Sequence, residues 1–133
     1  MLACTAIGAI WSSCSPDFGV KGVLDRFSQI KPKLIISSNG YYFKGQYFSS
    51  IEKLKSIIKA ISSIENVIIY KYTKNDKDAL SIPSNFIFWE DILSSFNSNN
   101  ISFNQLSFDH PLYIMFSSGT TGKPKSIVHS AGG

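Results

Sequence analysis

Apolar residues recur along the chain with two different periods, which predict helices alternating with strands. The clearest helix covers residues 49–61, where apolar side chains fall on one helical face and lysines on the other. Ser49 and Glu52 have the spacing of a capping box at the start of this helix. Its apolar face consists of Ile51, Leu54, Ile57, Ile58 and Ile61.

A second helical stripe covers residues 20–30, and Pro32 ends it because proline cannot continue a helix. Asp17 is the expected N-cap, since its carboxylate can accept hydrogen bonds from N–H groups that have no partner at a helix start. A shorter helix is expected over residues 89–96. The stripe consists of Val20, Val23, Leu24, Phe27 and Ile30.

Short apolar runs between these helices predict strands. Strands that are apolar on both faces are buried on both sides, as in a parallel sheet covered by helices. We therefore predict an α/β fold with a mostly parallel sheet and flanking helices. The runs are residues 34–36, 66–70, 86–88, 112–116 and 127–129, and the expected loops are residues 12–17, 37–40, 73–85 and 94–104.

The first eleven residues are almost entirely apolar, and we interpret them as a buried helix that begins within an element. They are too few to cross a bilayer, which needs about 20 apolar residues. The first cation is Lys21, so the segment lacks the positive start of a secretory signal. Cys4 and Cys14 form neither a metal motif nor a disulfide framework, and a cytosolic location is therefore expected.

Composition excludes several classes of protein. The 133 residues can form one domain or part of one. Hydrophobic residues make up 44% and charged residues 17%, which disfavours a disordered tail. The net charge of +4 is spread from Lys21 to Lys125, and Arg26 is the single arginine. Nucleic-acid binding is therefore disfavoured.

The segment 117–125, directly after an apolar strand, has the chemistry of a phosphate-binding loop. Gly119 and Gly122 let backbone N–H groups approach an anion without a Cβ in the way. Hydroxyl and ammonium groups supply further donors, and Pro124 stiffens the end of the loop. The polar side chains are those of Ser117, Ser118, Thr120, Thr121, Lys123 and Lys125.

Two common nucleotide motifs do not fit this segment. The Walker A loop needs two glycines five positions apart, whereas Gly119 and Gly122 are three apart and Pro124 follows Lys123. The Rossmann pattern of three glycines is missing as well. An ordinary turn rich in glycine, serine and threonine remains the plain alternative, but it does not require hydroxyls, two glycines and Pro-Lys in this order. We therefore favour phosphate binding.

Residues 117–125 resemble, at every position, the phosphate-binding signature of the adenylate-forming acyl-CoA synthetases. The flanking segments resemble the acetoacetyl-CoA synthetases within that family, and the resemblance is weakest over residues 39–47 and 73–104. The flanking matches are residues 7–13, 15–19, 23–30, 110–112 and 128–133.

This resemblance implies a two-step, AMP-forming acid–CoA ligase that uses ATP, Mg²⁺ and coenzyme A to activate acetoacetate. Lys123 occupies a variable position, and Ser126 replaces the usual small glycine or alanine. By position, the residues implied to hold the β- and γ-phosphates are Ser117, Ser118, Gly119, Thr120, Thr121, Gly122 and Lys125.

Members of the family that these residues resemble are several times longer than the present 133 residues. We therefore expect residues 1–133 to be an internal fragment of the large N-terminal AMP-binding domain, without the C-terminal domain that carries the catalytic lysine. No catalytic residue and no metal ligand is assigned here, and the fragment is expected to be inactive alone. The alternatives are an acetyl- or other short-chain acyl-CoA synthetase, and a non-catalytic nucleotide-phosphate-binding module that is complete as written.

Other candidates have plain explanations. His129 could face the nucleotide, but a strand histidine satisfied by its neighbours is the favoured interpretation. His110 is expected to mark the start of a strand at Pro111. Asp17 and Asp25 are expected to act as a helix cap and a surface carboxylate rather than as a catalytic pair. The aromatic residues show no stacking platform with adjacent basic residues, and core or interface positions are expected for them.

Overall fold

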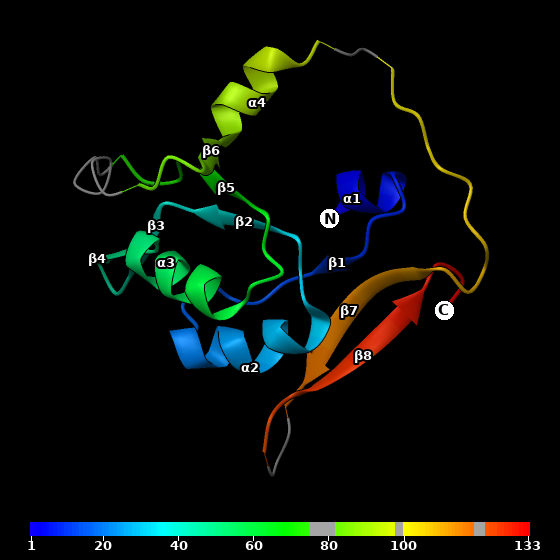
Figure 1. Cartoon of the computed structure of the whole chain (residues 1–133), viewed down its shortest axis with the longest axis horizontal. Helices are drawn as coiled ribbons and strands as arrows, with labels where there is room; N and C mark the ends of the chain where they lie inside the picture. The colour runs from blue at the N-terminus through cyan, green and yellow to red at the C-terminus, as the bar shows by residue number, and fades with distance from the viewer. Residues whose placement is uncertain (75–81, 98–99, 119–121) are drawn as a thin grey trace. The chain divides into compact units, whose positions relative to one another are not determined.

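The computed structural model describes residues 1–74, 82–97, 100–118 and 122–133. The chain divides into two compact units. One consists of Met1–Cys14 with Ser98–Gly133, and the other of Ser15–Asn97. Figure 1 shows the elements of each unit along the chain. Each unit has its own sheet, so the two are described separately.

The unit Ser15–Asn97 is built on a three-stranded parallel sheet. Its strands are β2 (Leu34–Ser38), β5 (Asn66–Tyr70) and β6 (Phe86–Phe88), in the order β2-β5-β6 (Figure 1). Ile35 pairs with Val67, and Val67 pairs with Phe86, so these side chains lie on one face. The predicted parallel α/β arrangement is confirmed in this unit.

Three helices accompany this sheet: α2 (Val20–Ile30), α3 (Ile51–Ala60) and α4 (Trp89–Ser95). The apolar stripes predicted from the sequence supply the core. The buried apolar residues are Val23, Ile35, Ile51, Leu54, Ile57, Ile61, Val67, Ile69 and Phe86.

The opposite face of the sheet differs from the prediction. Leu34, Ile36 and Ile87 alternate with the buried residues, and they are 39–44% exposed. Successive side chains of a strand point to opposite faces, so burial of Ile35 against the core turns its neighbours away from it. In the part of the chain that the structure describes, the sheet is therefore buried on one face only, not on two.

An antiparallel hairpin follows β2 over residues 40–49, where the sequence predicted no strand. Its strands are β3 (Gly40–Phe43) and β4 (Gln46–Ser49). The connecting residues Lys44 and Gly45 have φ of 49° and 76°, the pair of positive angles that suits a tight two-residue turn. The expectation of turn residues over 37–40 is wrong, because β2 continues through Ser38 and β3 begins at once at Gly40.

Both predicted helix caps are wrong in detail. The N-cap of α2 is Gly19, not Asp17, and no side chain caps the helix. The N-cap of α3 is Ser50, one residue later than the capping box required. Ser49 Oγ instead accepts a 3.2 Å hydrogen bond from Ile51 N. The hairpin pairs Ser49 with Gly40 and so keeps Ser49 in β4.

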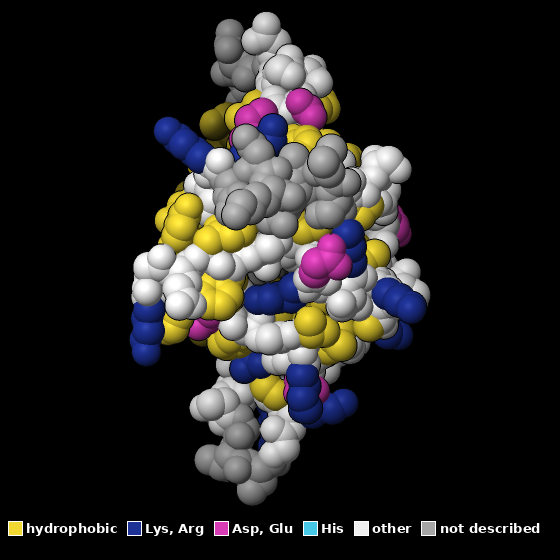
Figure 2. Space-filling view, turned by 90° about the vertical axis from the view of Figure 1, so that its left-hand side faces the viewer, with side chains coloured by type: hydrophobic (Ala, Val, Ile, Leu, Met, Phe, Trp, Pro, Cys, Tyr) yellow, Lys and Arg dark blue, Asp and Glu magenta, His cyan; other side chains and the backbone are white. Residues whose placement is uncertain are grey.

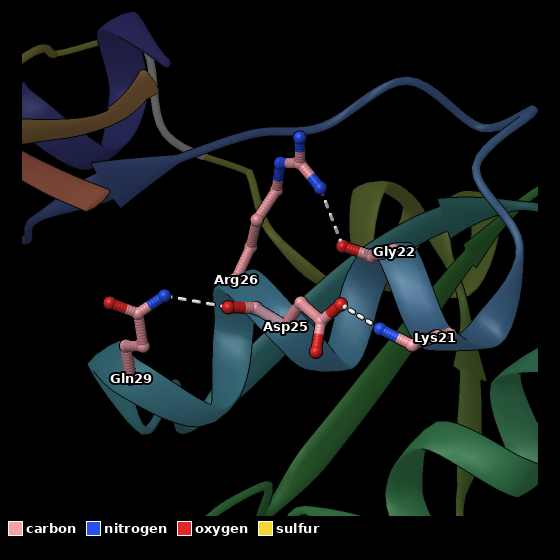
Figure 3. Close-up of polar contacts among 5 residues, drawn as sticks. All are labelled: Lys21, Gly22, Asp25, Arg26 and Gln29. Carbon is pink, nitrogen blue, oxygen red and sulfur yellow. Dashed lines mark hydrogen bonds and ion pairs between the residues drawn. The ribbon is translucent and has the colours of Figure 1, made fainter. Parts of the chain in front are cut away.

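The polar face of α2 carries contacts between residues one turn apart (Figure 3). Lys21 Nζ lies 2.7 Å from Asp25 Oδ2, and Arg26 donates to the Gly22 carbonyl at 2.8 Å. The Gln29 amide donates to the Asp25 carbonyl. An ion pair one helical turn apart, such as Lys21–Asp25, contributes about 0.3–0.5 kcal/mol. The Asp25 side chain is only 20% exposed, so the position predicted to be on the surface is partly buried in the structure.

The second unit holds α1 (Leu2–Ala6) and a sheet of order β1-β7-β8. The strands are β1 (Trp11–Ser12), β7 (Pro111–Ser117) and β8 (Lys125–Ser130). β1 runs parallel to β7, and β8 runs antiparallel to it. The two strands predicted around 112–116 and 127–129 are confirmed, and His110 does precede β7.

The interpretation of residues 1–11 as a buried helix is wrong. The helix ends at Ala6, and Gly8 has φ of 77°, which a helix does not allow. Leu2 is 77% exposed. Asn104 Nδ2 donates to the Ile7 carbonyl, and His110 Nε2 lies 2.9 Å from the Gly8 oxygen. These contacts with a distant part of the chain end the helix early. No helix of the described residues is long and apolar enough to cross a membrane.

Two glycines of the larger unit should respond oppositely to alanine. A Cβ at Gly40 would lie 2.7 Å from the Phe48 carbonyl oxygen, which the hairpin holds in place. Gly40→Ala should lower the free energy of unfolding by about 1–3 kcal/mol. In Gly22→Ala the new methyl meets only the Phe18 side chain, at 3.6 Å or more, and should stabilise α2 by about 0.5–1 kcal/mol. Urea unfolding of both variants tests this, and equal stability would contradict it.

Candidate functional site

The predicted phosphate loop connects β7 to β8. Ser117 is the last residue of β7 and pairs with Lys125, the first residue of β8. Gly122 has φ of 116°, an angle that side chains other than glycine rarely adopt. Gly119, Thr120 and Thr121 lie outside the described residues. The glycine at 122 is thus required by the backbone itself, as expected of a loop that brings N–H groups close to a ligand.

The described side chains of this loop are accessible. Ser117 is half-buried, whereas Ser118, Lys123 and Lys125 are exposed. Because Ser117 and Lys125 are cross-strand partners, their side chains lie on the same face of the hairpin. A hydroxyl and an ammonium group are therefore presented together at the start of the loop. This arrangement suits an anion with several oxygen atoms.

His129 has a partner within the sheet. Its ring stacks on Tyr113 with centroids 4.7 Å apart and an interplanar angle of 13°. The pair follows from the register, which places Tyr113 opposite His129. His129 lies on the same face as Lys125, but four residues of strand place it roughly 13 Å away. The stack supports the interpretation of His129 as a satisfied strand histidine.

The unit Ser15–Asn97 contains a cavity of about 500 Å³ that sequence reasoning missed. Four of the six tyrosines of the chain line it, which departs from the expected core and interface positions. Ser15, Asp17 and Ser38 supply polar side chains to the lining. Asp17, the charged residue of the lining, lies here instead of capping α2. The aromatic side chains are Tyr41, Tyr42, Phe43, Tyr70 and Tyr72.

The topology explains why these residues meet. Ser38 and Tyr70 are the last residues of β2 and β5, which pair in parallel with Ser38 opposite Tyr70. Ligand pockets in open parallel sheets form beyond the carboxyl ends of the strands. The hairpin that begins at Gly40 places three more aromatic rings at the same end. The sequence signal was a pair of runs, Tyr-Tyr-Phe-Lys at 41–44 and Tyr-Lys-Tyr at 70–72.

Two lysines lie next to two of these aromatic rings, although neither lines the cavity. Lys53 Nζ donates to the Pro16 carbonyl at 2.7 Å and lies 5.2 Å from the centre of the Tyr41 ring. Lys44 Nζ lies 5.5 Å from the centre of the Phe43 ring. Figure 2 shows Lys and Arg side chains interspersed with hydrophobic ones on one face, with Asp and Glu side chains among them. The expectation that no aromatic platform has adjacent basic residues is therefore wrong. This combination suits a planar ring with anionic substituents.

Titratable groups add little chemistry to the described residues. The Ser107 hydroxyl and backbone N–H donation, with a smaller effect of His110, hold the pKa of Asp109 below its ordinary value. Asp109 is fully exposed and is a carboxylate at neutral pH. Within residues 1–74, 82–97, 100–118 and 122–133, no group of three His, Cys, Asp or Glu side chains could hold a metal ion.

Comparison with known proteins assigns the chain to a family. The model of the AMP-binding enzyme family matches residues 1–133. Acetoacetyl-CoA synthetase of Macaca fascicularis is 51% identical over 137 residues, which cover 100% of this chain and 20% of that protein. Malonamoyl-CoA synthetase vrtB of Penicillium aethiopicum is 36% identical over 136 residues, which cover 98% of this chain and 19% of that protein.

The fold comparison agrees with the sequence comparison. The structure of acetoacetyl-CoA synthetase from Streptomyces lividans matches with a TM-score of 0.84 and 35% identity, over 99% of this chain and 19% of that one. The chain thus spans about one fifth of the length of the relatives it matches. The resemblance to acetoacetyl-CoA synthetases is confirmed. The chain belongs to the AMP-binding enzyme family.

Proposed function

We propose that these 133 residues form part of the large N-terminal adenylation domain of a longer, AMP-forming acid–CoA ligase, and that its acid is acetoacetate. The observation that carries the proposal is the 51% identity to an acetoacetyl-CoA synthetase across the whole chain. That stretch includes the phosphate loop between β7 and β8. We also propose a cytosolic location, as expected from the cysteine content of the sequence.

The proposed reaction has two steps. A carboxylate oxygen of the acid attacks the α-phosphorus of ATP, the bond to the β-phosphate oxygen breaks, and pyrophosphate leaves. The thiolate of coenzyme A then attacks the acyl carbon and AMP leaves. Acid, ATP and coenzyme A therefore give acyl-CoA, AMP and pyrophosphate.

The loop acts in the first step. Negative charge increases on the departing pyrophosphate, so donors fixed in place around it stabilise the transition state more than the bound ATP. The loop offers hydroxyl, ammonium and backbone N–H groups and no carboxylate, so it suits phosphate oxygens rather than a resident metal. Mg²⁺ accompanies ATP as part of the substrate. The proposed phosphate ligands are Ser117, Ser118, Gly119, Thr120, Thr121, Gly122 and Lys125.

We assign the tyrosine-lined pocket to the adenosine part of coenzyme A. Aromatic rings favour stacking on a purine, and a ring-lined site with lysines nearby suits a nucleotide that carries phosphates. Lys44 and Lys53 lie next to two of the rings of this pocket. The pocket belongs to the unit Ser15–Asn97, and the phosphate loop belongs to the other unit.

The test uses the enzyme encoded by the complete reading frame. Acid-dependent exchange of radioactive pyrophosphate into ATP reports the first step without coenzyme A. We expect exchange with acetoacetate, weaker exchange with malonamate, which also carries a carbonyl at its third carbon, and little with acetate.

Three outcomes would overturn the proposal. Exchange that is fastest with acetate would indicate a short-chain acyl-CoA synthetase. ATP binding without exchange for any acid would indicate a non-catalytic module. A native transcript with a stop codon directly after Gly133 would exclude the longer ligase.

A further inference from the structure

The single residue between β2 and β3, Asn39, has a buried polar side chain. Asn39 is only 7% exposed, and its side chain forms three hydrogen bonds with backbone groups. Its Nδ2 donates to the Thr73 carbonyl at 2.9 Å. Its Oδ1 accepts hydrogen bonds from the N–H groups of Tyr72 and Thr73, both at 3.0 Å. Asn39 therefore holds the chain that leaves β5.

The backbone of Asn39 extends this connection. Asn39 N donates to the Tyr70 carbonyl at 3.0 Å, and the Asn39 carbonyl accepts from Ser50 N at 3.0 Å. One residue thus joins the end of β2, the end of β5 and the start of α3. Replacing a buried amide whose donor and acceptor are both satisfied costs stability, because the backbone groups that it bonded are left buried without partners.

The pocket depends on the segment that Asn39 holds. Tyr70 and Tyr72 line the cavity, yet they are 45% and 64% exposed. Side chains with so little packing of their own take their position from the backbone beneath them. That backbone is bonded to Asn39 at Tyr70, Tyr72 and Thr73.

We propose that Asn39 is a positioning residue, which fixes the Tyr70–Tyr72 wall of the pocket and thereby sets the affinity for coenzyme A. The inference rests on the proposed function, which places the adenosine of coenzyme A in this pocket. Asn39 does not touch the substrate. It acts through the two tyrosines.

The test compares two substitutions with a matched control in the full-length ligase. Asn39→Ala removes three hydrogen bonds, and Asn39→Asp keeps the acceptor but places an oxygen against the Thr73 carbonyl. Ser63→Ala is the control, since Ser63 Oγ donates to the Pro32 carbonyl at 2.9 Å in the same unit and does not line the pocket. The measurements are KM for coenzyme A, KM for ATP and the rate of pyrophosphate exchange.

We expect Asn39→Ala to raise KM for coenzyme A about tenfold or more, with KM for ATP and the exchange rate within about twofold of the parent. Asn39→Asp should give an intermediate rise, and Ser63→Ala none. A uniform loss in all three quantities would show a merely structural role and overturn the proposal. A rise in KM for ATP instead would assign the pocket to the other adenine nucleotide and overturn it as well.

Two further measurements keep the proposal testable. Should the Asn39 variants fail to fold, Tyr72→Ala changes the wall at an exposed side chain, and an unchanged KM for coenzyme A would then refute the role of the wall. Calorimetric titration measures the dissociation constant for coenzyme A directly, without turnover. An unchanged affinity of Asn39→Ala for coenzyme A would refute this inference alone. Absence of pyrophosphate exchange in the parent enzyme would refute the proposed function.

Discussion

Lys125→Ala should slow acid-dependent pyrophosphate exchange in the full-length ligase about 10²–10³-fold, the loss typical of removing one fixed donor from a developing negative charge. Lys125 begins β8 opposite Ser117, so the sheet fixes the base of its side chain while the ammonium group stays exposed. Transfer to coenzyme A should be slowed far less, because pyrophosphate has already left. The second step is measured separately by supplying the acyl-adenylate with coenzyme A.

Lys123→Ala is the matched control for this prediction. Lys123 is exposed and carries the same charge, but it lies within the connection rather than in the β7–β8 ladder. Its loss should change exchange by less than about tenfold. Thr120→Ala should resemble Lys125→Ala, although Thr120 lies outside the described residues. Equal losses in both half-reactions for Lys125→Ala would contradict the role of the loop in pyrophosphate departure.

Ile69→Ala should lower the free energy of unfolding by about 2–5 kcal/mol, as large-to-small changes in a packed core do. Ile69 is 0% exposed in β5, the central strand of its sheet. The substitution removes buried methyl groups and leaves a cavity that the surrounding helices and strands fill only in part. Chemical denaturation followed by circular dichroism measures the change.

The control for Ile69→Ala is the same substitution on the opposite face of the sheet. Ile36 in β2 is 39% exposed, so Ile36→Ala should cost less than about 1 kcal/mol. Comparable losses for both variants would mean that the second face is also covered, and would refute the one-sided burial described for this unit.

The elements whose prediction succeeded are those with a strong local pattern. The stripe of residues 20–30 is α2, and the runs at 66–70 and 86–88 are β5 and β6 with the same bounds. The hairpin β3–β4 was missed because its turn uses Lys44 and Gly45 in place of the common Asn-Gly pair, and its strands are short. The cap of α3 was misassigned because Ser49 pairs with Gly40 in the hairpin and Ser50 N donates to the Asn39 carbonyl, so the helix begins one residue later.

The sequence identified the phosphate loop but not the tyrosine-lined pocket, and this difference has a physical cause. Residues 117–125 are contiguous, and the chemistry of a phosphate loop resides in the order of glycines, hydroxyls and lysines, so the sequence alone identified it and its family. The tyrosine-lined pocket joins residues 15–17, 38–43 and 70–72. The pairing of β2 with β5 and the hydrogen bonds of Asn39 bring the second and third of these segments together. A contiguous motif can be recognised from the sequence alone, whereas the proximity of segments far apart in the chain depends on strand register and on buried hydrogen bonds.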